Sequence, residues 1–590
     1  MQSPRANEFR QIFDLSGFWE LKFDEEDRGE AEGWGAGFPE GARPVAVPSS
    51  WNDQFAEGRD FLGPAWYKTV FSLPEDWRQK QALLRFDSVN YLARVWLNGK
   101  QLGDHEGGHL PFQWDASSFL VRGENTLVVR VDGRLAPDRV PPGDLRADPP
   151  DSFGNAPYPP SAFDFFPFCG IQRPVRICSV PRGGIEDIAV ETRMQGKNAF
   201  VVVRVRSGTS AAVLRARLSG FGLQDVQEAR SSGGSSQMEF TILAPALWAP
   251  DKPSLYNLTI EQLKNGSVAD RYAIPVGIRT VSVEGDTLLL NGKPVYLKGF
   301  GRHEDFPVVG RGLIPAVIVK DYSLMEWVGA NSFRTTHYPY SEQMMDLADR
   351  LGYLVIDETP AVGLFFHHEG LARRLELCRS FVRQLIDRDR NHPSVIAWSL
   401  ANEPHSGRAG AREFFRDLYD TAKTLDPSRP VTVVSYVGAE EKAFEFCDLV
   451  CLNRYFGWYT EPGRIEEGCA RLSRELDELH ARYPKPIILT EFGADSIAGC
   501  HAVEPEMFSE EYQAELLERS IGVLRTKGYV VGEHVWNLCD FKTSQEVKRF
   551  GGMNLKGVFT RDRRPKMAAY ALKRLWKEGK ADTPEPPRPC

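Results

Sequence analysis

Residues 394–404 read SVIAWSLANEP, an apolar run that stops abruptly at Asn402, Glu403 and Pro404. The run has the length and composition of a short buried strand, and a proline flanks it on each side. A second stretch, residues 485–493 with the sequence KPIILTEFG, repeats this plan and ends its apolar run at Glu491. The two stretches predict two buried strands that each end in a carboxylate.

Outward from these stretches, strand-like and helix-like segments alternate between residues 277 and 580. Such alternation predicts a (β/α)8 TIM barrel, in which catalytic groups lie at the carboxyl ends of the strands. Glu403 would then follow the fourth strand and Glu491 the seventh, so that both could share one mouth. The eight expected strands cover residues 295–298, 332–334, 353–357, 395–398, 431–434, 449–452, 487–489 and 530–535.

The chain before the barrel contains short strands and turns and few helical patterns. Residues 1–182 include candidate strands at 82–86, 93–97 and 126–131 and the turn pair Asn98-Gly99, which predict a jelly-roll-like β-sandwich. Residues 183–276 hold further strands, including 199–205 and 255–260, and predict an immunoglobulin-like β-sandwich. We expect the barrel at 277–580 and a disordered tail at 581–590, which is rich in proline and charge.

One long segment of the first domain does not fit a strand pattern. Residues 135–160 are rich in proline and lead into the aromatic run 163–168, FDFFPF. A loop of that length in a compact domain is usually functional or disordered. The aromatic end favours an anchored loop.

Composition and charge exclude several classes of partner. The 590-residue chain has a net charge of −8 and no block of lysine or arginine, so we expect neither nucleic acid nor an anionic membrane as a partner. It has no apolar signal segment at its start and no uninterrupted apolar run of membrane-spanning length. Nine cysteines without a regular framework suit free thiols. We therefore expect a soluble, cytoplasmic protein.

Two carboxylates facing each other at a barrel mouth suit glycoside hydrolysis, in which one acts as acid and the other as nucleophile or base. The neighbouring residues favour a sugar as the substrate. Asn402 can donate to a sugar hydroxyl, Tyr455 and Tyr459 follow the sixth expected strand, and Trp536 follows the eighth.

Four motifs resemble those of glycoside hydrolase family 2: NSFRTTHYP at 331–339, SLANEP at 399–404, NRYFGWY at 453–459 and TEFG at 490–493. The chain is similar to this family, and within it to the β-glucuronidases, over almost its whole length and in the same three-domain order. The resemblance implies that Glu403 is the acid/base and Glu491 the nucleophile of a retaining enzyme that forms a covalent glycosyl-enzyme. It also implies a sugar site lined by Asp164, His337, Asn402, Tyr455, Tyr459, Trp536 and Arg549, with Asp164 delivered by the first domain's loop.

The motif Asn554-Leu555-Lys556 matches the family's Asn-x-Lys pair for the carboxylate of a uronic acid. An amide and an ammonium are suitable partners for a carboxylate. We expect a neutral hexose to leave the Lys556 ammonium buried without a counter-charge. The implied substrate is a β-D-glucuronide, and no cofactor is expected.

The residues leave several alternatives open. A β-galacturonidase or β-galactosidase of the same family would share both glutamates, and a non-catalytic carbohydrate-binding protein would instead use the two sandwiches. Natural aglycone, glucuronide against galacturonide preference and oligomeric state are not decided, although we expect a homo-oligomer. His367, His368 and Glu369 lack the HExxH spacing of a zinc site, so no metal is expected.

Three further expectations concern the mouth. Some bacterial members of the family carry a long loop over it, whereas residues 361–373 are short here, which predicts tolerance of a bulky or polymeric aglycone. In a retaining enzyme the carboxyl groups of Glu403 and Glu491 should lie about 5 to 5.5 Å apart. We expect a raised pKa for Glu403 and a charged Glu491.

Overall fold

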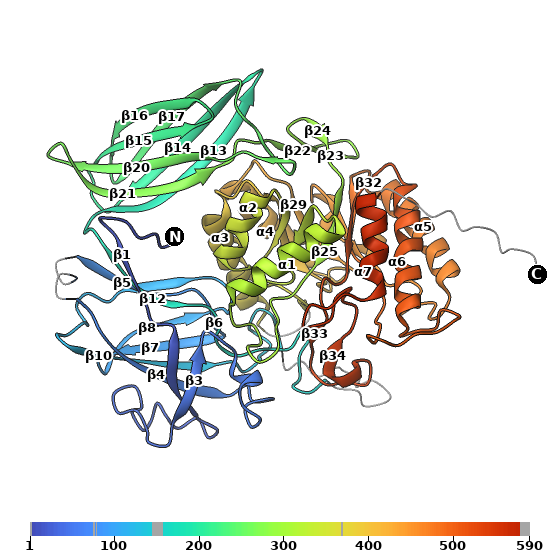
Figure 1. Cartoon of the computed structure of the whole chain (residues 1–590), viewed down its shortest axis with the longest axis horizontal. Helices are drawn as coiled ribbons and strands as arrows, with labels where there is room; N and C mark the ends of the chain where they lie inside the picture. The colour runs from blue at the N-terminus through green and yellow to red at the C-terminus, as the bar shows by residue number, and fades with distance from the viewer. Residues whose placement is uncertain (1–2, 75–76, 78–79, 144–156, 367–369, 579–590) are drawn as a thin grey trace, which may run out of the picture.

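The computed structural model describes residues 3–74, 77, 80–143, 157–366 and 370–578. Two antiparallel β-domains, blue and green in Figure 1, lie beside a barrel that runs from yellow-green to red. The expected tail at 581–590 and the His367-His368-Glu369 segment lie outside the described residues, as does most of the second half of the proline-rich loop. In the described part of the chain, no helix is both long and apolar enough to cross a lipid bilayer.

The first domain packs two sheets around one apolar core. Its strands are β1 (Gln11–Asp14), β2 (Gly17–Phe23), β3 (Arg43–Val47), β4 (Pro64–Ser72), β5 (Gln81–Phe86), β6 (Val89–Asn90), β7 (Leu92–Leu97), β8 (Lys100–Glu106), β9 (Phe112–Asp115), β10 (Glu124–Asp132), β11 (Gly170–Ile171) and β12 (Val175–Val180). One sheet has the order β1-β12-β5-β9, the other β3-β2-β4-β10-β7-β8, and β11 pairs with β6. Alternate residues of β7 are buried, as a half-exposed strand requires. Asn98 and Gly99 both have positive φ and join β7 to β8, which confirms the predicted turn.

The second domain is a smaller sandwich of two sheets. Its strands are β13 (Ile185–Gln195), β14 (Asn198–Ser207), β15 (Val213–Gly220), β16 (Leu223–Arg230), β17 (Ser235–Leu243), β20 (Tyr256–Lys264) and β21 (Ser267–Val276). Sheets β13-β14-β17 and β16-β15-β20-β21 enclose a separate core, which suits the predicted immunoglobulin-like domain. The short pair β18 (Trp248–Ala249) and β19 (Lys252–Pro253) leads toward the barrel.

The barrel closes with eight parallel strands in chain order, as predicted. They are β25 (Leu297–Gly301), β26 (Ser332–Arg334), β27 (Leu354–Glu358), β28 (Val395–Asn402), β29 (Val431–Ser435), β30 (Val450–Asn453), β31 (Ile487–Glu491) and β32 (Val530–Val535). Every residue of β28 is buried, because helices cover one face and the barrel interior the other. The first strand begins two residues later than predicted and continues through two glycines, which do not read as strand in the sequence.

Helices follow seven of the eight strands. They are α1 (Pro315–Val328), α2 (Glu342–Leu351), α3 (Leu371–Asp389), α4 (Ala411–Leu425), α5 (Ile465–Arg482), α6 (Glu510–Arg525) and α7 (Met567–Lys573), the last continued by one π-helical turn, η6 (Arg574–Glu578). Between β29 and β30, residues 436–449 contain only the 3-10 turns η3 (Gly438–Glu440) and η4 (Ala443–Glu445). The helix expected between β29 and β30 is therefore replaced in this described segment by a short connection. Ser341 and Ser509 cap α2 and α6 by accepting a backbone N–H.

The two ends of the barrel are closed differently. The hairpin strands β22 (Val281–Glu284), β23 (Thr287–Leu290) and β24 (Lys293–Pro294) place Leu288 and Leu290 in a cluster with residues near the amino ends of the barrel strands, including Leu354 and Ile396. The opposite, carboxyl end is lined by loops and by β33 (Phe541–Lys542), η5 (Phe550–Gly552) and β34 (Met553–Asn554). This end also receives the first domain's loop, because Tyr158 pairs with Gln545 through two backbone hydrogen bonds.

Candidate active site

A cavity of about 440 Å3 opens at the carboxyl end of the barrel. Its walls come from loops after several barrel strands and from residues 157–164 of the first domain. It brings together ten of the eleven predicted site residues: Asp164, His337, Asn402, Glu403, Tyr455, Tyr459, Glu491, Trp536, Arg549 and Asn554. Lys556 does not line the cavity.

Glu403 follows β28 directly and has a backbone φ of +47°. A residue other than glycine in this region costs on the order of 1 to 3 kcal/mol, and such strain recurs at functional sites. The strained backbone is held because Glu403 N–H donates to the Val434 carbonyl at 2.8 Å. Asn453 Nδ2 donates to Glu403 Oε1 at 2.8 Å, and burial raises the pKa of Glu403.

Glu491 is the last residue of β31 and has stronger partners than Glu403. Arg334 Nη2 forms an ion pair with Oε1, and the Tyr455 hydroxyl donates to Oε2 at 2.7 Å. Burial raises the pKa of Glu491 to about 8, the charge of Glu403 adds to the rise, and Arg334 and Tyr455 oppose it.

The expected contrast between the two glutamates was therefore wrong in one respect. The pKa of Glu403 is raised as predicted, but the pKa of Glu491 is raised as well. The charge of Glu403 contributes to the rise at Glu491, so the two carboxyl groups hold one proton between them below about pH 8. The physical reason is that two buried carboxyl groups oppose joint ionisation. When Glu403 and Glu491 share one proton, their single negative charge is favoured on Glu491, because the Arg334 guanidinium contacts that side chain.

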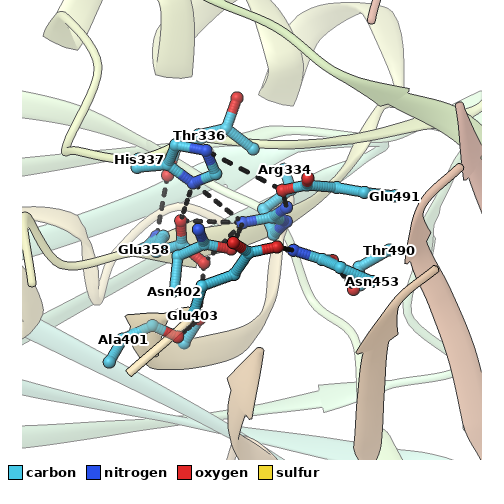
Figure 2. Close-up of polar contacts among 12 residues, drawn as sticks. Arg334, Thr336, His337, Glu358, Ala401, Asn402, Glu403, Asn453, Thr490 and Glu491 are labelled. Atoms are coloured by element: carbon cyan, nitrogen blue, oxygen red, sulfur yellow. Dashed lines mark hydrogen bonds and ion pairs between the residues drawn. The ribbon is translucent and has the colours of Figure 1, made fainter. Parts of the chain in front are cut away.

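Arg334 and Glu358 belong to the same network, although neither was among the predicted site residues. Arg334 Nη1 donates to both carboxylate oxygens of Glu358 at 2.8 Å, and Figure 2 shows Arg334 between Glu358 and Glu491. Burial opposes ionisation of Glu358, but Arg334, His337 and Ser399 together hold its pKa below the ordinary value. Glu358 ends an apolar strand just as Glu403 and Glu491 do, so the same sequence pattern could have found it.

His337 lies between this network and the cavity. Its Nδ1 is 3.0 Å from Glu358 Oε1, its Nε2 is 3.7 Å from Glu491 Oε1, and its ring stacks on Trp536 at 5.1 Å between centroids. Burial lowers the pKa of His337, so the ring is neutral. We assign the proton to Nδ1, where Glu358 accepts it, which leaves Nε2 as an acceptor.

Asn402 is oriented by donors on two sides. Its Oδ1 accepts from Arg334 at 3.3 Å and from Asn453 Nδ2 at 3.2 Å. Thr490 in turn donates to Asn453 Oδ1 at 2.8 Å. With its oxygen used in this way, the Nδ2 of Asn402 is available as a donor in the cavity wall.

The cavity wall also holds Asp164, which the first domain's loop delivers as expected. Arg549 Nε donates to Asp164 Oδ1 and Asn554 Nδ2 to Oδ2, both at 2.6 Å. These two contacts join segments that lie more than 380 residues apart in the sequence.

Lys556 lies behind Tyr459 and is fully buried. Its ammonium contacts Asp495 at 2.5 Å and donates to the Tyr459 hydroxyl at 2.8 Å. Burial opposes the charge, but Tyr459 and Asp495 raise the pKa of Lys556. The expectation that Lys556 has no counter-charge in the protein was therefore wrong, because Asp495 supplies one from the loop after β31.

Sequence reasoning also missed the wall beside Glu403. His405 and Tyr436 line the cavity there, and the Tyr436 hydroxyl lies 3.2 Å from His405 Nδ1. Phe365 stacks on the His405 ring at 4.2 Å between centroids. No sequence motif marked these residues, because their approach depends on how the loops after β27, β28 and β29 pack.

Within the described residues, one group has the ligand types and spacing of a metal site, namely Asp346, Asp349 and His392, which do not line the cavity. His392 Nδ1 lies 2.6 Å from Asp349 Oδ2. Burial opposes protonation, but the Asp349 charge raises the pKa of His392 to about 9. A protonated ring is an ion-pair partner rather than a metal ligand.

Comparison with known families gives one consistent result. The family models for glycosyl hydrolases family 2 match residues 12–181 (sugar binding domain), 184–279 and 281–580 (TIM barrel domain). A β-glucuronidase from Paenibacillus borealis is 40% identical over 602 residues, covering 98% of this chain and 99% of that protein. The human β-glucuronidase is 38% identical, covering 98% of this chain and 92% of the human protein.

Solved structures agree with the sequence comparisons. An uncultured Clostridium β-glucuronidase has a TM-score of 0.91 and 39% identity, over 98% of this chain and all of that one. The Ruminococcus gnavus β-glucuronidase in complex with D-glucuronic acid has a TM-score of 0.91 and 37% identity, over 98% and 99% of the two chains. Together with the three-domain architecture, these matches confirm a glycoside hydrolase, and the chain belongs to glycoside hydrolase family 2.

Proposed function

We propose that this enzyme is a retaining β-glucuronidase that hydrolyses β-D-glucuronides by double displacement. The observation that carries the proposal is a single cavity lined by Glu403 and Glu491 together with the anion-binding groups Arg549 and Asn554. Relatives named β-glucuronidase that match almost the whole chain support the substrate class.

In the first step, the Glu491 carboxylate attacks the anomeric carbon while Glu403 gives its proton to the glycosidic oxygen. The bond from that carbon to the oxygen breaks, the protonated aglycone leaves, and the sugar stays bound to Glu491 as an ester. In the second step, Glu403 takes a proton from water, and the resulting oxygen attacks the anomeric carbon and releases Glu491.

The unequal contacts of the two glutamates support this division of roles. Arg334 and Tyr455 both stabilise negative charge on Glu491, whereas Glu403 accepts a side-chain hydrogen bond from the neutral amide of Asn453. A proton shared by the pair is therefore favoured on Glu403, where the leaving oxygen needs it.

The corner around Asp164 supports a uronic acid as the sugar. Asp164 aligns the Arg549 guanidinium and the Asn554 amide, and Nη1 of Arg549 is buried without a hydrogen-bond partner among the described residues. Behind them, Lys556 donates to the Tyr459 hydroxyl, which leaves the Tyr459 proton free to donate to a carboxylate. Cationic and hydroxyl donors at one end of the cavity suit the carboxylate of a glucuronide.

A panel of 4-nitrophenyl β-glycosides tests the substrate. The glucuronide should have the highest kcat/KM, followed by the galacturonide, with glucoside and galactoside far below. Preference for the galacturonide or galactoside would replace the assignment with those activities, and inactivity on all four would favour a carbohydrate-binding role. Proton NMR of the first-formed product should show the β-anomer, and the α-anomer would refute retention.

We also propose a cellular compartment and an oligomeric state for the enzyme. We propose that the enzyme is a homo-oligomer. We also propose that it lies in the cytoplasm, because eight described cysteines are free thiols, which suits a reducing compartment. Fractionation and sedimentation equilibrium test these two points. The domain boundaries near residues 182 and 276 can be tested by limited proteolysis.

A further inference from the structure

Glu358 is a third carboxylate in the catalytic network, and the proposed mechanism gives it no reaction step. It is completely buried at the end of β27 and lies below the cavity rather than in its wall. A buried carboxylate is costly unless it is fully paired and hydrogen-bonded. The presence of a buried carboxylate beside the two catalytic glutamates therefore needs an explanation.

Four contacts hold the Glu358 carboxylate. Arg334 Nη1 donates to both oxygens at 2.8 Å, His337 Nδ1 lies 3.0 Å from Oε1, and the Ser399 hydroxyl donates to Oε2 at 2.7 Å. The Glu358 backbone N–H donates to the Thr335 hydroxyl at 2.7 Å. Figure 2 shows that the other nitrogen of the same guanidinium faces Glu491. Arg334 is thus shared by two carboxylates.

The charged and titratable groups around Glu491 come from every neighbouring element. Arg334 and the neutral His337 come from β26 and the loop after it, Glu358 from β27, Glu403 from the end of β28, and Tyr455 from the loop after β30. His534 on β32 lies beyond Arg334 and is neutral, because burial lowers its pKa to about 3. Arg334 is therefore the only cation in contact with Glu491 among the described residues.

We propose that Glu358 is a positioning residue that neutralises most of the Arg334 charge and so sets the electrostatic field acting on Glu491. With Glu358 present, the charge of Arg334 is shared between two carboxylates, so its ion pair with Glu491 orients the nucleophile at a reduced field. Glu358 also fixes the His337 tautomer, so that Nε2 faces Glu491 and the cavity as an acceptor for a sugar hydroxyl.

Loss of the Glu358 charge has a predictable direction. The whole Arg334 charge would then act on Glu491, and a carboxylate beside an arginine has a pKa lowered by about one to three units. The nucleophile would ionise at lower pH but would be a weaker nucleophile, because its charge is held by the guanidinium. The acid limb of the pH profile should therefore move down while the maximum rate falls.

This inference rests on the proposed role of Glu491, and its test separates the two. The pH dependence of kcat/KM is measured for wild type, Glu358→Gln and Glu358→Asp on whichever glycoside of the panel wild type cleaves best. Wild-type turnover tests the proposed function, and the difference between variants tests Glu358. Asp321→Asn is the matched control, because Asp321 is an equally buried carboxylate paired with Arg302 and Arg563 outside the cavity.

We expect Glu358→Gln to lower kcat at least tenfold and to move the acid limb down by about one unit or more. Glu358→Asp keeps the charge on a shorter side chain, so its acid limb should move in the same direction by less. Asp321→Asn should lower the melting temperature and leave the limb in place. If Glu358→Gln does not fold, the acid limb of Glu358→Asp alone tests the proposal. A lower rate with an unmoved limb in the folded variants would overturn the proposal and leave Glu358 a structural residue.

Discussion

Replacing Lys556 with methionine separates substrate recognition from fold stability. The side chain is fully buried, its ammonium pairs with Asp495 at 2.5 Å, and it donates to Tyr459 at 2.8 Å. Methionine keeps much of the side-chain length and removes the charge. Asp495 would then be a buried carboxylate without its main cation.

Two magnitudes follow from this geometry. Breaking a buried ion pair by removing one partner costs about 3 to 5 kcal/mol of stability. Lys556 donates to the Tyr459 hydroxyl, so its charge acts on a sugar carboxylate through one hydrogen bond from that hydroxyl. One charge-assisted hydrogen bond contributes about 1.5 to 3 kcal/mol, which is roughly a 10- to 150-fold loss of kcat/KM on a glucuronide. We expect little change on a glucoside, which has no carboxylate.

The double variant Lys556→Met with Asp495→Asn removes both charges and serves as the internal control. It should recover most of the unfolding free energy, measured in urea, and still lack glucuronide selectivity. Tyr459→Phe removes only the hydroxyl between Lys556 and the cavity, so it should reduce selectivity by about tenfold at nearly unchanged stability. If the double variant regained selectivity, or if Lys556→Met lowered kcat/KM equally on both sugars, Lys556 would have no part in recognising the uronate.

Three further predictions concern the mouth of the barrel. Glu491→Gln should abolish turnover, whereas Glu403→Gln should spare substrates with good leaving groups more than poor ones; equal losses on both substrates would contradict the assigned roles. Because the pKa of Glu491 beside Glu403 is raised from 4.5 to about 8, the fold disfavours ionisation of both carboxyl groups, so the associated stability is present below pH 4.5 and is lost as the pH rises through 8. Glu491→Gln should therefore have the melting temperature of wild type near pH 4.5 and a higher one at pH 8, and a pH-independent difference would refute this reasoning. The short 361–373 segment predicts that glucuronic-acid-terminated oligosaccharides are cleaved at rates comparable to small aryl glucuronides, and a strong preference for the aryl compounds in parallel assays would count against an open mouth.

The sequence by itself determined the barrel and its two central glutamates. Apolar runs such as 395–398 and 487–489 are local signals, because a barrel strand buried on both faces must be apolar along its length. A carboxylate directly after such a run marks the mouth, and this pattern located Glu403 and Glu491. The same pattern at 354–358 also marks Glu358.

The tertiary structure alone decided which charges meet. Asp495 neutralises Lys556 across 61 residues of sequence, and Asp164 aligns Arg549 across 385. Such pairs depend on how loops from different strands and domains converge, and no local pattern encodes their distance. Burial in one cavity likewise raises the pKa of both Glu403 and Glu491, since a shift depends on desolvation and on neighbouring charges that only the folded chain brings together.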